Sequence, residues 1–121
     1  MSRRTREAAF QKIRRNGPLF AALGDETRLM LVIRLSSGSR FSIASLARDS
    51  SLTRQAITKH LLILQQAGLV QSTRRGRENL FQLRTRRLDE ARRSLERISR
   101  QWDESLSRLK SFVESKPVET P

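Results

Sequence analysis

The chain contains no cysteine and a single histidine among its 121 residues. Without thiols it has no disulfide bonds, no thiolate metal ligands and no cysteine nucleophile. One imidazole cannot complete the ligand set of a zinc site without further histidines or cysteines. We therefore expect no bound metal and no other cofactor.

Long hydrophobic runs are also absent. No stretch approaches the roughly 18 to 20 apolar residues that a membrane-spanning helix needs. The basic N-terminus is not followed by a continuous apolar segment, so it does not resemble a secretory signal. The sequence therefore predicts a cytoplasmic protein without a membrane partner.

The sequence lacks the motifs of common enzyme sites. It has no Gly-rich phosphate loop and no serine in a nucleophile elbow. Acidic residues occur as sequence neighbours, as at Asp103 and Glu104, and such neighbours point in different directions on a helix. They do not form an acid/base dyad, and we expect no enzymatic activity.

Acidic residues are scarce relative to basic ones. The chain has 12 Asp and Glu against 25 Lys and Arg, which gives a formal net charge of +13. A charge of this size favours polyanionic partners such as DNA, RNA or an anionic membrane surface. Part of it lies near the N-terminus, where the cluster either forms a basic arm or serves solubility; its members are Arg3, Arg4, Arg6, Lys12, Arg14 and Arg15.

What is present is a series of short helical patterns, two strand patterns and one long helix. Periodicity and turn residues predict a mainly α (α+β) chain, with helices at 7–15, 19–23, 26–36, 43–48 and 53–66, strands at 69–74 and 79–84, and a long helix at 87–114. Residues 40–42 form either a one-turn connector or a very short strand. Asp25 is a suitable N-cap for the third helix. Six of the seven residues at 29–35 are apolar, so we expect this helix to be mostly enclosed at the centre of the core.

Residues 52–84 combine an amphipathic helix, a glycine stop and two strands around an Arg-Gly-Arg turn, which is the pattern of a winged helix-turn-helix. The second helix of such a motif can enter a DNA major groove. If Ile57, Leu61 and Leu64 face the core, the polar side chains near the start of the helix face outward. The predicted contacts with DNA bases or phosphates are Thr53, Arg54, Gln55, Thr58 and Lys59. Thr53 is also a plausible N-cap, which would leave it less free for a base.

His60 lies next to the apolar stripe of the same helix. We expect it to pack near the turn of the motif or to contact a phosphate, and we include it among the candidate DNA-binding residues. A role as a metal ligand is not expected, because the chain has no second histidine and no cysteine.

The turn between the two strands carries three arginines around a glycine. Gly76 allows the positive dihedral angle that a tight hairpin needs. Arginines on such a hairpin can reach a minor groove or neighbouring phosphates, and these contacts add affinity and salt dependence more than sequence choice. The predicted wing contacts are Arg74, Arg75 and Arg77.

The long C-terminal helix carries apolar residues at alternating spacings of three and four, a narrow seam typical of a helix that packs on another helix. About 28 residues would span roughly 42 Å, more than a compact domain of this size offers. A symmetric dimer is the simplest solution. It would place the two reading helices, which are the helices at 53–66 that enter the major groove, about 34 Å apart, a distance of one DNA turn. The predicted interface consists of Phe10, Ile13, Leu88, Leu95, Ile98, Trp102, Leu106, Leu109 and Val113.

These elements predict one domain with mobile ends. The expected division is a mobile basic N-terminus at 1–6, a DNA-binding and dimerisation domain at 7–114 and a disordered tail at 115–121. Inside the domain we expect a helix-turn-helix at 43–66, a two-stranded wing at 69–84 and dimerisation helices at 7–23 and 87–114.

The function that fits best is a homodimeric, sequence-specific repressor that occupies operator DNA. Two other classes remain open. The charge would also suit an architectural or RNA-binding module without sequence choice, and the long helix would suit a protein-interaction adaptor.

Several runs of the sequence resemble regulators of the ArsR/SmtB type. They are LGDETRL at 23–29, ITKHLLIL at 57–64, AGLV at 67–70 and RGR at 75–77, and the similarity covers about residues 18–84. The resemblance implies a winged-helix homodimer that binds double-stranded DNA at a palindromic operator and dimerises through its first and last helices.

The chain departs from the metal-sensing members of that family. Those members carry cysteines on the first helix of the turn motif, or His and acidic residues on the last helix. Here the first position reads IASLA at 43–47, and the last helix has no histidine. The resemblance therefore implies a metal-independent branch, whose effector is an organic ligand or a protein, unless it has none.

Overall fold

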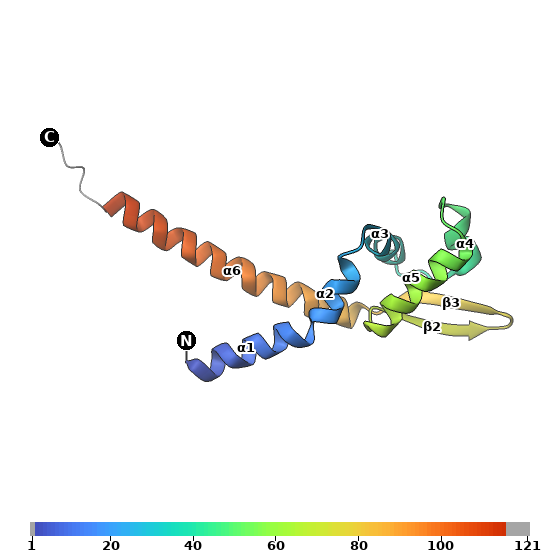
Figure 1. The fold of residues 1–121 in the computed structure, drawn as a ribbon, viewed down its shortest axis with the longest axis horizontal. Coiled ribbons are helices and arrows are strands. Elements are labelled where there is room, and N and C mark those ends of the chain that lie inside the picture. The colour runs from blue at the N-terminus through green and yellow to red at the C-terminus, as the bar shows by residue number, and fades with distance from the viewer. Residues whose placement is uncertain (1, 116–121) are drawn as a thin grey trace. The chain divides into compact units, whose positions relative to one another are not determined.

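The computed structural model describes residues 2–115, apart from the side chain of Ile13. The elements are α1 (Arg3–Arg15), α2 (Gly17–Leu23), α3 (Glu26–Leu35), β1 (Phe41–Ser42), α4 (Ile43–Arg48), α5 (Arg54–Gln66), β2 (Val70–Arg75), β3 (Glu78–Leu83) and α6 (Thr85–Ser115) (Figure 1). This is a mainly helical winged helix-turn-helix with a long last helix, as the sequence predicts. The predicted tail, apart from Ser115, lies outside the described residues.

The chain divides into two units at Ala91. The first unit holds every element up to the start of α6, and the second unit begins at Arg92 and continues the same helix. The core lies in the first unit and is supplied by α2, α3, α4, α5, β2, β3 and the start of α6; its fully buried members include Leu19, Leu35, Leu46, Ile57, Leu61, Leu64, Leu69 and Val70. Each such side chain stabilises the fold by about 1.5–3 kcal/mol relative to leaving it in water.

Helix α3 is less enclosed than its composition suggests. Asp25 caps it as predicted, because its side chain accepts a hydrogen bond from the Arg28 backbone N–H at 3.0 Å. However, Leu29, Met30 and Ile33 are 44%, 56% and 55% exposed, so the prediction of a mostly enclosed helix is wrong. One face of α3 packs on the core, and a domain this small has no further layer in the first unit to cover the other.

Helix α1 begins at Arg3, four residues before the predicted start at 7. Ser2 explains the difference. Its hydroxyl oxygen accepts a hydrogen bond from the Thr5 backbone N–H at 3.2 Å, and its carbonyl accepts one from the Arg6 backbone N–H at 3.1 Å. A serine in this position satisfies amides that the first turn of a helix leaves free.

The sheet has three antiparallel strands in the order β1-β3-β2. Residues 40–42 therefore supply a short strand rather than a connector, with Phe41 opposite Phe81 and Ser42 opposite Leu80. Ser42 then caps α4, since its hydroxyl oxygen accepts from the Ser45 backbone N–H at 3.1 Å. β2 and β3 form the predicted wing, in register from Val70–Leu83 to Arg75–Glu78.

Candidate nucleic-acid interface

Helix α5 is held by its inner face. Ile57 and Leu64 are fully buried and Leu61 is 1% exposed. The helix packs on α4, β2, α3 and α2. Thr53 is its N-cap, because its hydroxyl oxygen accepts a hydrogen bond from the Ala56 backbone N–H at 3.1 Å. These contacts fix which side of α5 faces outward.

The outward side of α5 carries the polar residues predicted for DNA contact. Arg54, Gln55, Thr58 and Lys59 are all exposed. The Thr58 hydroxyl donates to the Arg54 carbonyl at 2.7 Å, so its proton is engaged within the helix. The side chains of Arg54, Gln55 and Lys59 make no hydrogen bond or ion pair with other residues of the described chain. Gln55 and Lys59 stand one turn apart on the side opposite the buried stripe.

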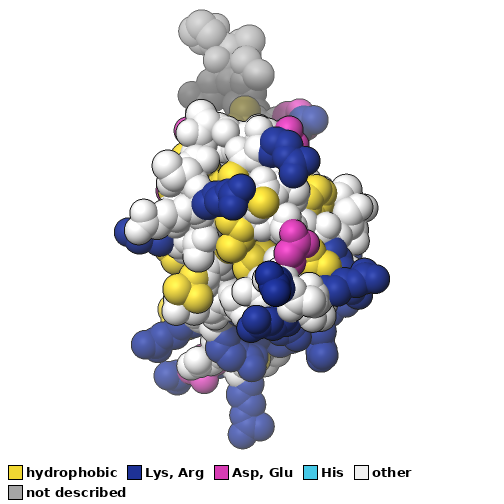
Figure 2. Space-filling model, turned by 90° about the vertical axis from the view of Figure 1, so that its right-hand side faces the viewer, with side chains coloured by type: hydrophobic (Ala, Val, Ile, Leu, Met, Phe, Trp, Pro, Cys, Tyr) yellow, Lys and Arg dark blue, Asp and Glu magenta, His cyan; other side chains and the backbone are white. Residues whose placement is uncertain are grey.

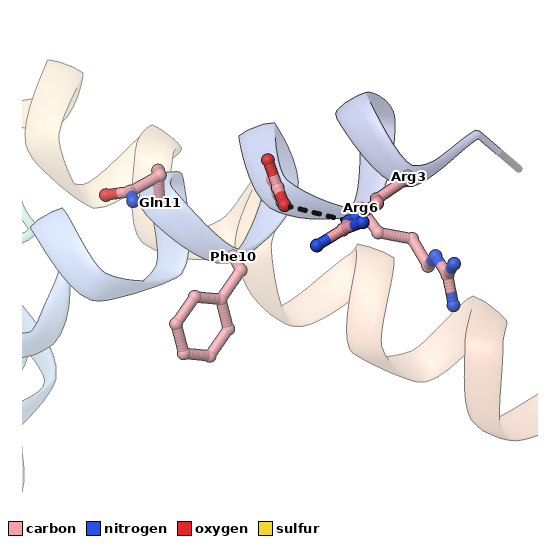
Figure 3. A pocket seen from close by; sticks show the side chains of 5 residues that line it. Arg3, Arg6, Phe10 and Gln11 are labelled. Carbon is pink, nitrogen blue, oxygen red and sulfur yellow. Dashed lines mark ion pairs between the residues drawn. The ribbon is translucent and has the colours of Figure 1, made fainter.

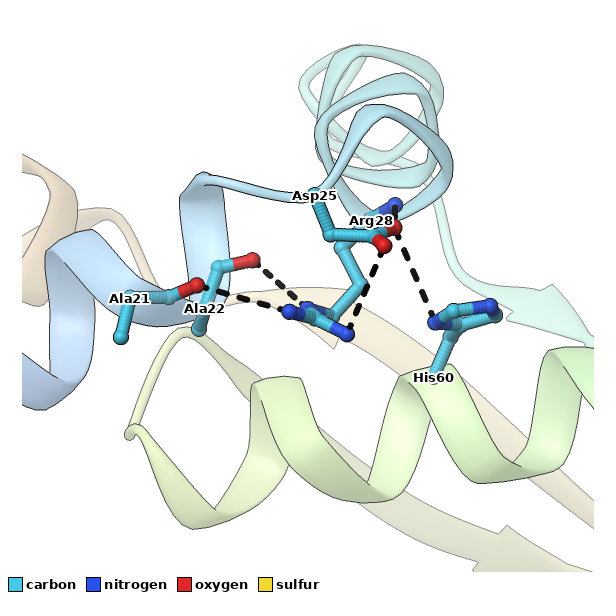
Figure 4. Close-up of polar contacts among 5 residues, drawn as sticks. All are labelled: Ala21, Ala22, Asp25, Arg28 and His60. Atoms are coloured by element: carbon cyan, nitrogen blue, oxygen red, sulfur yellow. Dashed lines mark hydrogen bonds and ion pairs between the residues drawn. The ribbon is translucent and has the colours of Figure 1, made fainter.

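His60 takes a different direction from these residues. Its ring points toward Asp25 at the start of α3, with Nδ1 at 4.0 Å from Asp25 Oδ1 (Figure 4). This Nδ1 is buried without a hydrogen-bond partner among the described residues. The guanidinium of Arg28 completes the cluster, lying 4.0 Å from Asp25 Oδ2 and donating to the Ala22 carbonyl at 2.7 Å. The cluster joins the loop before α3 to the middle of α5.

Asp25 is the titratable group that this cluster perturbs. The hydrogen bond from the Arg28 backbone N–H holds the pKa of Asp25 below its ordinary value of 3.8. The charges of Arg28 and His60 act in the same direction, while burial opposes them. Asp25 is therefore an ionised cap at neutral pH.

The wing presents its arginines on two faces. Gly76 and Arg77 form a two-residue turn, and Gly76 has a φ of +62°, as the first position of a type II′ turn requires. Residues directly opposite each other share a face, so Arg74 lies on the side of Val70 and Phe81, and Arg75 lies on the other side. The sequence predicts one group of three arginines, whereas the register separates Arg74 from Arg75.

A hydrogen bond from helix α5 identifies the face of the wing that lies next to this helix. The Gln65 side-chain amide donates to the Ser72 hydroxyl at 3.3 Å, and Ser72 shares its face with Arg74. Figure 2, which views the protein from the side toward which the hairpin projects in Figure 1, shows many Lys and Arg side chains and few acidic ones. Gln65 thus ties helix α5 to the face of the wing that carries Arg74.

Two arginines position these elements, and the sequence did not single them out. Arg34 on α3 donates to the Leu46 carbonyl at 2.9 Å and to Asp49 at 3.2 Å, which ties α3 to the end of α4. Arg87 at the start of α6 donates to Asn16 and to the Ala67 carbonyl. Their partners are distant in sequence, so no local spacing reveals them.

The predicted dimerisation residues are mostly exposed. In the second unit, the exposed seam of α6 consists of Leu95, Ile98, Trp102, Leu106, Leu109 and Val113, together with Phe112, which the predicted spacing missed. In the first unit, Leu88 packs partly against the core. Phe10 is 63% exposed and lines a shallow hollow with Arg3, Arg6, Glu7 and Gln11 (Figure 3). All five come from α1, so the hollow is an open helix face rather than an enclosed site.

Between residues 2 and 115, no helix has the length and apolar character needed to cross a bilayer. Over the same residues, no group of three or more His, Asp or Glu side chains is arranged to hold a metal ion.

A winged helix-turn-helix with an exposed polar reading helix and a basic hairpin defines a DNA-binding transcriptional regulator. No protein-family model matches the chain. It is 32% identical to the HTH-type transcriptional regulator Rv2034 of Mycobacterium tuberculosis over 99 residues, which cover 82% of this chain and 89% of that protein. It is 43% identical to the HTH-type regulator YuzN of Bacillus subtilis over 65 residues, 49% of this chain and 71% of that protein.

Solved structures agree with these relatives. The ArsR-like transcriptional regulator from Rhodococcus sp. RHA1 has a TM-score of 0.72 and 40% sequence identity, covering 86% of this chain and 97% of that one. The chain belongs to the ArsR family of transcriptional regulators.

Proposed function

We propose that the protein is a homodimeric, sequence-specific repressor that acts by occupying a palindromic operator and excluding polymerase. The observation that carries this proposal is the division of α5 between two faces. Its buried stripe fixes the helix in the core, and Arg54, Gln55 and Lys59 project from the start of the helix without partners among the described residues. That is the end of a recognition helix that meets base edges.

Each polar residue near the start of α5 has a proposed role. Gln55 reads adenine and Arg54 reads guanine, the pairings their donor and acceptor groups favour. Thr58 uses its methyl group and its acceptor oxygen, because its proton is engaged. Lys59 meets a phosphate, Thr53 presents the helix start, and His60 packs against Asp25 and contacts a phosphate with its other ring nitrogen.

The wing arginines supply affinity rather than sequence choice. Arg77 at the tip and Arg74 on the face beside α5 contact phosphates or the minor groove, and Arg75 joins them from the other face of the ribbon. Such contacts release counterions, so they strengthen binding to every sequence and make it depend on salt.

The dimer forms through α6 and α1. With 31 residues, α6 would be about 46 Å long, and the second unit leaves its apolar seam exposed. A second copy covers this seam, because a symmetric pair satisfies both seams at once, and Phe10 and Ile13 of α1 join the proposed interface. Trp102, 64% exposed, is the expected anchor of the interface.

The regulator works without a metal or other cofactor. Helix α4 presents Ile43, Ser45 and Leu46 where metal-sensing members carry cysteines, and the described part of α6 has no histidine. The effector, if the protein has one, is an organic ligand or a protein.

The test is footprinting of the full-length protein on genomic DNA fragments in the presence of excess competitor DNA. We expect protection of a palindrome whose half-sites lie about one helical turn apart, roughly 34 Å. Uniform coating without a preferred palindrome, or tighter binding to RNA than to any duplex DNA, would replace this proposal with an architectural or RNA-binding role.

A further inference from the structure

Arg87 lies where three segments of the first unit meet. Its Nη1 donates to the Asn16 side-chain oxygen at 3.2 Å and to Glu90 at 2.6 Å, and its Nε donates to the Ala67 carbonyl at 3.4 Å. Asn16 joins α1 to α2, Ala67 ends α5, and Glu90 belongs to the first turns of α6. One side chain therefore connects the end of the reading helix to both predicted dimerisation helices.

The end of α5 is shaped to receive this side chain. Gly68 has a φ of +79°. Its N–H bonds the Gln65 carbonyl at 3.0 Å, and the Leu69 N–H bonds the Leu64 carbonyl at 2.9 Å, which together form a Schellman motif. The motif leaves the Ala67 carbonyl to Arg87. A Cβ at Gly68 would lie 3.3 Å from the Arg87 side chain, so the stem of Arg87 packs closely on the glycine.

The other contacts that hold α5 and the start of α6 do not duplicate the hydrogen bonds of Arg87. Helix α5 is fixed by its buried stripe, and the start of α6 by Ala91, which is buried, and Leu88, which is half-buried. Apolar packing of this kind is non-directional. The guanidinium, in contrast, is a planar fork whose donors fix direction as well as distance.

We propose that Arg87 is a positioning residue that sets the orientation of α5 relative to the start of α6, and thereby the spacing between operator half-sites that the dimer accepts. This inference rests on the proposed function, because it needs two reading helices held by a pair of α6 helices. The apolar seam lies further along the same helix that Arg87 anchors. The contacts of Arg87 can therefore link the arrangement of the α6 helices in the dimer to the orientation of α5 on DNA.

A purely structural role predicts a different outcome. If Arg87 merely caps the end of α5, its loss weakens the fold, and binding to single and paired half-sites falls in the same proportion. If Arg87 sets orientation, its loss leaves binding to a single half-site intact and relaxes the preference for one spacing.

The experiment compares Arg87→Met with Arg86→Met in the full-length protein. Methionine keeps an unbranched stem against Gly68 and removes every donor. Arg86 is exposed and has no ion pair or hydrogen bond among the described residues, so its substitution makes the same charge change. Affinity is measured for a duplex with one half-site and for duplexes with two half-sites whose spacing varies by single base pairs. Thermal unfolding accompanies each variant.

We expect the wild type and Arg86→Met to favour one spacing by about ten-fold or more, and Arg87→Met to favour it by about two-fold or less, with unchanged single half-site affinity. A spacing preference that survives in Arg87→Met would overturn the inference, as would a proportional loss on both kinds of duplex. If Arg87→Met does not fold, Arg87→Lys, which replaces the fork with a single nitrogen, must show the same relaxation. A wild type without any spacing preference would instead refute the proposed dimeric operator binding.

Discussion

At the scale of single residues, the contacts that a polar side chain of α5 already makes determine which of its groups are available to a DNA base. The Thr53 hydroxyl caps the helix and the Thr58 proton is engaged within it. Gln55 has no such contact among the described residues and lies opposite the buried stripe. It is therefore the residue from which we expect the most base discrimination.

Gln55→Ala should reduce discrimination between operator variants at one base-pair position by about 1–3 kcal/mol, because a bidentate amide–adenine contact is lost. Competition binding with single-base operator variants measures this. Gln66→Ala is the matched control, since Gln66 is an exposed glutamine at the other end of α5. Equal weakening on all variants by Gln55→Ala would show that Gln55 reads no base.

Arg77→Ala should weaken binding to all sequences by a similar factor and reduce the slope of log affinity against log salt by about one, because one phosphate contact is lost. Affinity titrations at several salt concentrations measure the slope. A change in base preference with an unaltered salt slope would contradict the division of labour between α5 and the wing.

Asp25 should make part of the free energy of unfolding depend on pH in the acidic range. The pKa of this carboxyl is lowered in the folded state, so its contribution is present above the ordinary value of 3.8 and is lost as the pH falls through the lower, folded pKa. Urea unfolding at a series of pH values should show wild type more stable than Asp25→Asn at neutral pH. The difference should shrink steadily below about pH 4. A difference that persists at the lowest pH would argue against an ionised cap.

At the scale of elements, local sequence patterns predict most of the helices and strands. They do not predict the contacts between residues that lie far apart in the sequence. The periodicity of α5, the Asp25 cap and the glycine of the hairpin are local signals, and each predicted element is present. The exposed face of α3 was missed because a run of apolar residues does not show how many sides a small core can cover. The contacts of Arg34 and Arg87 were missed because their partners lie far away in the sequence.

The candidate site likewise has features that the sequence predicts and features that depend on packing and strand register. The outward direction of Arg54, Gln55 and Lys59 follows from helical periodicity, and the structure has them exposed. The direction of His60 toward Asp25 depends on the packing of α3 on α5, which periodicity does not give. The separation of Arg74 from Arg75 depends on strand register, which the length of the turn sets.

Gly76→Ala should destabilise the wing without a steric clash. A Cβ at Gly76 meets nothing within 4 Å, but φ is +62°, a conformation that costs an L-residue about 1–3 kcal/mol. Thermal unfolding measures the loss. Gly24→Ala is the control, because Gly24 has a φ of −75° and its Cβ would meet two backbone oxygens only at 3.4 Å; it should be nearly neutral. Equal effects of the two substitutions would mean that the turn conformation carries no strain.

At the scale of the whole molecule, two units share helix α6 and differ in what they contain. The first unit contains the core, the reading helix and the wing, and the second unit is an exposed amphipathic seam. We propose that the protein binds DNA through the first unit and associates with a second copy mainly through the second unit. The two tasks can therefore be separated by mutation.

Trp102→Glu should dissociate the dimer, because it places a charge in the middle of the apolar seam. Sedimentation of the variant should give a monomer, with single half-site affinity retained and palindrome affinity reduced by about 100-fold or more. Gln101→Glu makes a similar charge change one residue away and off the seam, so it should remain dimeric. A dimeric Trp102→Glu would exclude this seam as the interface.

We propose above all that this ArsR-family protein recognises a single operator as a dimer. Selection of bound sequences from a random pool of duplex DNA at fixed salt tests it most directly, since it reports half-site sequence and half-site spacing together. We expect a palindrome with two half-sites at one fixed spacing, about one helical turn from centre to centre. An enriched pool with a single unpaired half-site, or with no common sequence, would contradict it.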